Sequence, residues 1–378
     1  MNSQKPAALS IPFQIIALSV LLTLLCGVLT PYQLSKTNTW PNNYYIMTSE
    51  WKFGQPESPW AYRLLKPIVA GLMPGDVRYN YIILTYISLI ISAAGIYQLL
   101  RIFAVPSLQS TFAVIAFAFS YPFRNSLKYP WMLDDVTFLF LIFGVIAITL
   151  NKRTVFSILL TLGVCNHEHV LFLVPVYFFW VFSRRSFSIR LNDLIMDMFY
   201  LIPAAIMFIG IRIMIPIPNK EFFSYYLSAA NIARCYQLQG GLFNIINLTY
   251  NTFGFLWILS LFACLKLKLS GIEKAVIFVV PLSLIQLVFG CDTIRLVAVN
   301  LPLLFILSFR VLSKIQPAWT FFTLVVLLIR SFSRSRFAGV SLFHPQWLMT
   351  IPTEAIVGVE MLAFLLLMYF YRNISHFE

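Results

Sequence analysis

Residues 133–150 read LDDVTFLFLIFGVIAITL, with two adjacent carboxylates, Asp134 and Asp135, at the head of a strongly apolar run. Acids at the mouth of a membrane helix are costly unless they face water, a cation or another partner. The stretch therefore predicts a membrane helix with a polar site at one membrane face. The alternative is helix capping, because an acid at a helix N-terminus interacts favourably with free backbone amides. Capping accounts for one acid more readily than for two.

The composition of the whole chain points to lipid as its solvent. Of 378 residues, 60% are hydrophobic and 11% are charged, and the mean hydropathy is +0.82. A soluble domain carries about 25% charged residues. In a membrane protein, Lys and Arg lie at helix ends and bind anionic headgroups or phosphorylated substrates. The net charge of +13 thus indicates membrane lipids as partners and no nucleic acid.

Apolar segments follow one another along the entire chain. We find about eleven, one of them split, and so predict an all-α polytopic bundle of about 11–12 membrane segments forming a single domain, 1–378. Their approximate ranges are 11–29, 79–103, 108–121, 133–150, 154–182, 194–216, 243–265, 272–290, 296–312, 318–332 and 355–371. The first segment is interpreted as a membrane helix and not as a cleaved signal peptide. Segment 154–182 is interrupted by Asn166-His167-Glu168-His169, which predicts a helical hairpin with a polar tip.

The distribution of Lys and Arg predicts the orientation. Short connectors dense in these residues lie on the side that also receives both termini, and this side is cytoplasmic by the positive-inside rule. The long loops, 32–78, 217–242 and 333–354, are then external. Loop 32–78 contains an apolar stretch, 60–73, that is too short to span and predicts an interfacial helix. Cys235 and Cys291 fall on the external side, where a disulfide between them is one possibility.

This orientation brings polar residues from separate segments to one external face, as an active site or a permeation vestibule requires. The candidate catalytic residues are Asp134, Asp135, Glu168, His167 and Glu50. The candidate substrate-binding residues are Arg63, Lys66, Arg124, Lys128, His169, Asp292 and Arg295. No CxxC pair is present, and His167 and His169 are two residues apart instead of the four of a helical zinc pair, so no metal site is assigned.

These residue types allow acid–base chemistry and anion binding. Two carboxylates side by side in a partly dry site can supply a general base or bind a cation. In the tetrad, a carboxylate between two imidazoles can orient a base or hold a proton. Asp292 and Arg295 are spaced for an internal ion pair, and Arg295 can equally grip a phosphate in bidentate fashion.

In layout the chain resembles the GT-C superfamily of integral-membrane glycosyltransferases. The likeness lies in a first span followed by a long external loop with interfacial helices, and in acids, here Asp134 and Asp135, at the head of the fourth span. The run 62–67, YRLLKP, also resembles a Tyr-Arg-x-Leu-x-Pro stretch of bacterial membrane proteins of this type. Such enzymes usually carry an Asp in the first external loop as catalytic base. Here that loop has no Asp before Asp76, so Glu50, the Asp pair or Glu168 would take this role.

The resemblance implies an enzyme that moves a sugar from a polyprenyl-phosphate-linked donor to a glycan, lipid or protein acceptor at the outer face of the bacterial plasma membrane. Arg and Lys residues, with or without a divalent cation such as Mg²⁺ or Mn²⁺, would stabilise the departing lipid phosphate. A transporter or flippase of a lipid-linked or anionic solute is the alternative, although no inverted repeat is evident. A polymerase or ligase of lipid-linked glycans is a further alternative with the same external face.

Overall fold

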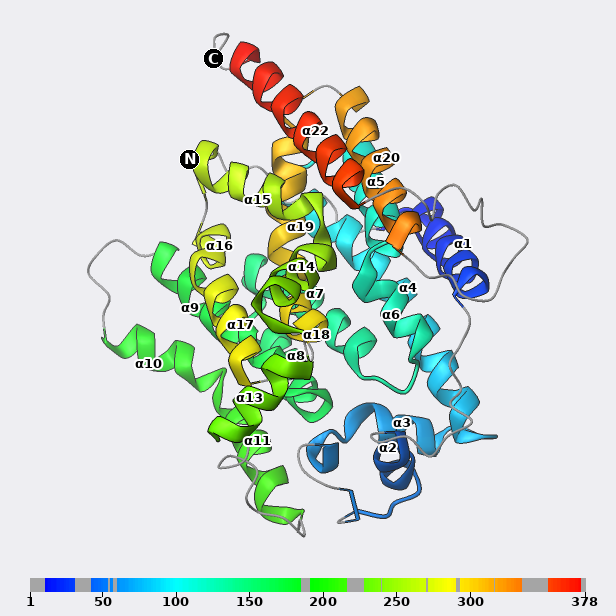
Figure 1. The fold of residues 1–378 in the computed structure, drawn as a ribbon. Coiled ribbons are helices and arrows are strands. Elements are labelled where there is room, and N and C mark those ends of the chain that lie inside the picture. Colours follow the sequence, from blue (N-terminus) through cyan, green and yellow to red (C-terminus); the bar gives the residue numbers. More distant parts are fainter. Residues whose placement is uncertain are drawn as a thin grey trace.

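The computed structural model describes residues 11–30, 42–53, 55–56, 60–184, 191–215, 228–238, 240–269, 271–289, 293–315, 317–334 and 353–374. Within these ranges every regular element is a helix, which confirms the predicted all-α bundle (Figure 1). The first half contains α1 (Phe13–Leu29), α2 (Asn42–Ser49), η1 (Trp60–Tyr62), α3 (Leu65–Leu72), α4 (Val77–Ile102), α5 (Ser107–Ala118), α6 (Tyr121–Lys128), α7 (Asp134–Thr149), α8 (Arg153–Asn166), η2 (Glu168–Phe172) and α9 (Leu173–Arg184). The second half contains α10 (Leu191–Phe199), α11 (Ile202–Met214), α13 (Ala229–Leu238), α14 (Gly241–Phe253), α15 (Phe255–Lys266), α16 (Gly271–Lys274), α17 (Val276–Phe289), α18 (Thr293–Ala298), α19 (Leu301–Leu312), α20 (Pro317–Arg334) and α22 (Thr353–Ile374).

Helix α7 lies inside the bundle and packs against α4, α8 and α9 (Figure 1). It is apolar on all sides, as expected for a helix that is surrounded by other helices, and most of its side chains are buried. Gly144 permits the close approach of α9, because a β-carbon at this position would overlap the side chain of Leu173. The buried position of α7 places the carboxylates at its N-terminus at the meeting point of several helices.

The helices differ in how well they match a membrane span. Among the described residues, α4 alone is long and apolar enough to cross a membrane by length and composition, and α14 with α15 would form a second span if that bent pair is counted as one. The axes of α14 and α15 differ by 82°, and the break falls at Gly254. Further apolar helices of 10–17 residues include α1, α8, α11 and α19. Several predicted segments are divided into shorter helices; for example, segment 243–265 falls on α14 and α15, and segment 194–216 falls on α10 and α11.

The first long loop forms the short helices α2, η1 and α3, and hydrogen bonds attach them to the bundle. The Asn80 side chain on α4 donates to the backbone carbonyls of Ala70 (2.9 Å) and Met73 (3.0 Å) at the end of α3. The backbone N–H of Leu64 donates to the carbonyl of Cys165 on α8 (2.7 Å). The turn that carries Arg63 and Lys66 is therefore held between α4 and α8.

The predicted hairpin 154–182 has the expected break. Helix α8 ends at Asn166, the 3-10 turn η2 follows, and α9 begins at Leu173. The Asn166 side chain donates to the carbonyl of Leu133 (3.0 Å) and to Oγ1 of Thr137 (3.1 Å), so the break is tied to the start of α7.

The cysteines fall into two groups. Cys26, Cys165 and Cys264 are free thiols, whereas Cys235 on α13 is disulfide-bonded. Cys291, its predicted partner, lies outside the described residues.

Candidate functional site

Three ion pairs meet where the first loop, α7, η2 and α18 come together. Lys66 pairs with Asp135, Arg295 with Asp134, and Arg63 with Glu168. The six side chains form one electrostatic group, because Lys66 interacts with both Asp residues and His169 interacts with Glu168, Arg63, Arg295 and Asp134. We call these six residues together with His167 and His169 the charged cluster. The structure thus brings together eight of the residues predicted for the external site.

The Lys66–Asp135 pair forms the sealed side of the charged cluster. Its side chains are 0% and 1% exposed. The Lys66 ammonium donates to Asp135 Oδ1 (2.7 Å), to Thr85 Oγ1 (2.9 Å) and to the carbonyls of Pro130 (2.7 Å) and Met132 (2.8 Å). Burial lowers the pKa of Lys66, and the charge of Asp135 opposes this shift. Asp135 is thus out of reach of a substrate, and the pair ties α3 to α7.

The Asp134–Arg295 pair links α7 to α18. Nε of Arg295 donates to both carboxylate oxygens of Asp134, at 3.0 and 2.7 Å. The predicted pairing partner of Arg295, Asp292, lies outside the described residues. Asp134 and Asp135 are also the first two residues of α7, where the helix dipole stabilises negative charge. Ion pairing and the helix-start interpretation therefore both apply to these two acids.

The Arg63–Glu168 pair forms the open side. Arg63 donates to both oxygens of Glu168, with Nε at 3.2 Å from Oε2 and Nη2 at 2.5 Å from Oε1, and its Nη1 donates to the Tyr45 hydroxyl (3.1 Å). Burial disfavours the charged guanidinium, but Glu168 and Tyr45 more than compensate, so the pKa of Arg63 lies above its ordinary value. The Glu168 side chain is 31% exposed, which makes it the most accessible carboxylate of the charged cluster.

Two histidines flank Glu168. The rings of His167 and His169 are 4.0 Å apart between centroids, and both residues are buried. Nδ1 of His167 accepts the backbone N–H of His169 (3.2 Å) and lies 3.6 Å from Oε2 of Glu168. This hydrogen bond requires Nδ1 of His167 to be unprotonated. The imidazoles therefore lie beside the partly exposed carboxylate of Glu168, with Nδ1 of His167 occupied as an acceptor.

The remaining predicted site residues lie elsewhere. Glu50 pairs with Lys52 (2.6 Å), and both side chains are exposed. Lys128 lies over the ring of Tyr129, 5.2 Å from its centroid. Arg124 is buried on α6, where its charge interacts with Cys26 and Tyr121.

Arg212 was missed by the sequence analysis. It is the only charged residue of α11 (IPAAIMFIGIRIM), and its charge interacts with those of Glu168 and Arg63. A charged residue inside an apolar segment is by itself a pointer to function. The signal was therefore present in the sequence, but the predicted segment 194–216 was interpreted only as a span.

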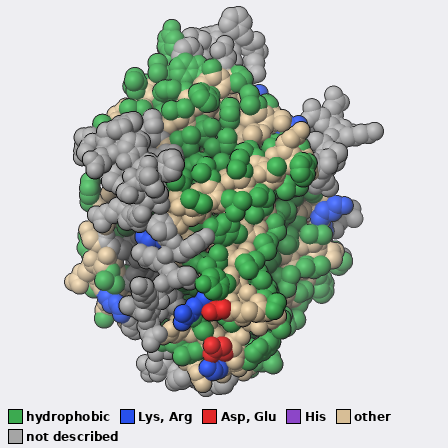
Figure 2. Space-filling view, turned by 90° about the vertical axis from the view of Figure 1, so that its right-hand side faces the viewer, with side chains coloured by type: hydrophobic (Ala, Val, Ile, Leu, Met, Phe, Trp, Pro, Cys, Tyr) green, Lys and Arg blue, Asp and Glu red, His purple; other side chains and the backbone are tan. Residues whose placement is uncertain are grey.

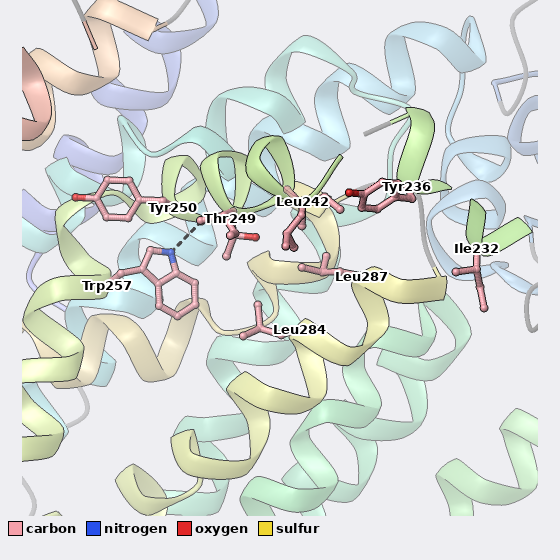
Figure 3. A pocket seen from close by; sticks show the side chains of 10 residues that line it. Ile232, Tyr236, Leu242, Thr249, Tyr250, Trp257, Leu284 and Leu287 are labelled. Carbon is pink, nitrogen blue, oxygen red and sulfur yellow. Dashed lines mark hydrogen bonds between the residues drawn. The ribbon is translucent and has the colours of Figure 1, made fainter. Parts of the chain in front are cut away.

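An apolar pocket lies between helices next to α18, which contacts α14 and α17. It has a volume of about 520 Å³ and is lined by side chains from α13, α14, α15 and α17. Figure 3 shows Leu284 and Leu287 facing Leu242 and Trp257 across it. Nε1 of Trp257 donates to the carbonyl of Thr249 (3.0 Å), which fixes the indole at the pocket wall. Such a lining suits a hydrocarbon chain.

The donor atoms of the charged cluster do not form a metal site. Within the described ranges, no group of three or more His, Cys, Asp and Glu residues is arranged to hold a metal ion. Each carboxylate of the charged cluster already has a cationic partner, so these acids do not fit a divalent cation such as Mg²⁺ or Mn²⁺.

Comparisons of the chain with known protein families, with curated proteins and with solved structures find no match. What the site does must therefore be inferred from its own residues.

Proposed function

We propose that the protein is an integral-membrane glycosyltransferase that moves a sugar from a polyprenyl-phosphate-linked donor to an acceptor. The observation that carries the proposal is the juxtaposition of the charged cluster and the apolar pocket. Helix α18 contacts both α14 and α17, which line the pocket, and its Arg295 binds Asp134 of the charged cluster. A charged region beside an apolar pocket suits an amphiphile with an anionic head and a hydrocarbon tail.

Exposed apolar side chains support the proposal of a polytopic membrane protein. Phe13, Met214 and Phe243 are at least 80% exposed. Figure 2 shows a largely hydrophobic face on which the visible acidic side chains lie near the lower end. A soluble protein rarely exposes apolar surface on this scale. A membrane would cover it. We propose a bacterial plasma membrane, with both termini cytoplasmic as the distribution of Lys and Arg predicts.

The disulfide at Cys235 supports an external site. Disulfides persist in oxidising compartments and are rare in the cytosol. Helix α13, which carries Cys235, contacts α14 and α17, and both of these contact α18 of the charged cluster. The charged cluster would then face the outside of the membrane.

Glu168 is the proposed general base, because it is the most accessible carboxylate of the charged cluster, and one of its hydrogen bonds from Arg63 would be replaced by the substrate. It would accept the proton of an acceptor hydroxyl while the acceptor oxygen attacks the anomeric carbon. The bond from that carbon to the phosphate oxygen breaks, and the lipid phosphate leaves with the electron pair. Cationic side chains at the site would stabilise the charge on the departing phosphate. Asp134 would position Arg295, and Lys66 and Asp135 would hold the site together.

The test is a transfer assay in proteoliposomes with a polyprenyl-phosphate-linked sugar. Loss of a general base lowers rates by about 10²–10⁴-fold, so Glu168→Gln should lose most of its activity. The matched control is Asp76→Asn, which removes one external carboxylate; Asp76 caps α4 by accepting the backbone N–H of Arg78 (2.8 Å), and Asn caps equally well. Full activity of Glu168→Gln would remove it from the mechanism.

A transporter or flippase of the same class of solute is the second candidate, and the bent pair α14–α15 favours it. Discontinuous helices form the binding sites of many transporters, and here the 82° break borders the pocket. Flux of a labelled prenyl phosphate across the proteoliposome membrane without sugar transfer would select this function.

A further inference from the structure

Arg212 is held in a fixed position beside the open side of the charged cluster. Its guanidinium carbon lies 3.4 Å from the centroid of the Phe208 ring and 4.8 Å from that of the Tyr62 ring. Its Nη1 donates to the carbonyl of Phe208 (3.0 Å), one turn earlier in α11. Aromatic faces attract a guanidinium and restrict its motion. Tyr62 directly precedes Arg63, so one turn of chain supplies both the platform for Arg212 and the partner of Glu168.

Arg212 lacks an ion-pair partner among the described residues. In the described part of the chain, Arg212 forms no ion pair, whereas Arg63, Lys66 and Arg295 each have a carboxylate partner. A guanidinium cannot lose its proton in a protein, and placing it half-buried without an anion is unfavourable. Among the described residues, the charged cluster and Arg212 together contain three acids and four cations, and Arg212 is the cation without an ion-pair partner. A cation in this position fits an anionic ligand.

We propose that Arg212, stacked on Tyr62, binds a phosphate mono- or diester group of the substrate. A guanidinium presents five N–H donors in a planar fork that matches two oxygens of a phosphate. The Phe208 carbonyl takes one of the donors on Nη1. The edge formed by Nε and Nη2 has no described partner and can meet the ligand. The inference rests on the proposed function for the presence of an anionic substrate at this site, but not on sugar transfer itself.

Binding measurements on the full chain in nanodiscs of zwitterionic lipid test the assignment. The probes are geranyl phosphate, its neutral counterpart geraniol, and inorganic phosphate, and calorimetry gives the affinities. Arg212→Gln should weaken geranyl phosphate binding by about tenfold or more, because hydrogen bonds to charged groups are among the strong ones. Geraniol binding should not change. Arg212→Lys keeps the charge but loses the fork, and should lie between the wild type and Arg212→Gln.

The matched control is Arg78→Gln, which removes an exposed cation from the start of α4 and should bind geranyl phosphate like the wild type. If Arg78→Gln weakens geranyl phosphate binding as much as Arg212→Gln does, the loss reflects only the net charge of the protein, and the assignment is overturned. Unchanged geranyl phosphate binding in Arg212→Gln would overturn it as well. Melting temperatures check folding; if Arg212→Gln does not fold, the affinity of Arg212→Lys decides.

The phosphate has two possible sources, substrate or bulk headgroup, and a further measurement separates them. Nanodiscs with phosphatidylglycerol should compete weakly, and equally, in the wild type and Arg212→Gln. If Arg212→Gln lowers only phosphatidylglycerol binding, Arg212 is a headgroup anchor and the proposal fails. A parallel loss for inorganic phosphate and geranyl phosphate would support recognition of the phosphate itself. Phosphate binding through Arg212 without sugar transfer would leave the inference intact and refute the transferase.

Discussion

The Lys66–Asp135 and Arg63–Glu168 pairs lie in the same charged cluster but differ in access. Both join a cation of the first loop to an acid of the bundle, and both have oxygen–nitrogen distances below 3 Å. The first pair is sealed from solvent, whereas the carboxylate of the second is 31% exposed. Similar ion-pair chemistry thus serves two roles. The sealed pair connects helices, and we propose that the pair with the accessible carboxylate exchanges its partner for a substrate.

The sealed pair should give the largest change in stability. Lys66→Met leaves Asp135 buried without its cation, and loss of one partner of a buried pair costs about 3–5 kcal/mol. Denaturation of the solubilised protein measures this loss. The double variant with Asp135→Leu should recover much of it, because apolar replacement of a whole buried pair is often neutral. An unaltered unfolding midpoint in Lys66→Met would contradict a connecting role.

The Asp134–Arg295 pair should rank second. Asp134→Asn weakens two charge-assisted contacts, and we expect a destabilisation of about 1.5–3 kcal/mol. A double-mutant cycle with Arg295→Gln measures the coupling between the two side chains. Strictly additive effects would mean that the contact contributes no stability.

The open pair should rank third in stability. Glu168→Gln leaves the buried guanidinium of Arg63 its contact with Tyr45 and a neutral amide acceptor, and residue 168 is partly exposed. The free energy of unfolding should therefore fall by about 1–1.5 kcal/mol, between the values for exposed and buried pairs. A loss as large as that of Lys66→Met would erase the distinction between the two sides. Parallel denaturation curves of the two variants provide the comparison.

The Glu50–Lys52 pair is the most exposed of these four ion pairs and should have the smallest effect on stability. Its side chains are 44% and 51% exposed. Glu50→Gln should change the unfolding free energy by less than about 0.5 kcal/mol, and less still at high salt, since water and ions screen exposed charges. A salt-independent loss would show that this pair is less solvated than its exposure indicates.

Part of the site can be predicted from the sequence because it depends on the order of apolar and polar residues along the chain. The helix that begins at Asp134, the break at residues 166–169 and the short helices of the first loop all come from apolar runs and their interruptions. Counting crossings predicted one face for Arg63, Lys66, Glu168 and Arg295, and the structure brings these side chains into one cluster. Arg212 was missed although a charge inside an apolar segment is a signal in the sequence; only its place beside Tyr62, far away in the chain, required the tertiary structure.

By itself, the sequence determined an all-helical chain with polar residues gathered at one end. Hydrophobic periodicity and the positions of charges are properties of neighbouring residues, so they can be identified without knowing how the helices pack. The tertiary structure alone decided which acid meets which cation: Asp135 with Lys66, Asp134 with Arg295 and Glu168 with Arg63. It also decided that Asp135 is sealed and Glu168 accessible. Partner choice and burial depend on how α3, α7, η2 and α18 pack, because ion pairs form between side chains that distant segments bring within about 4 Å.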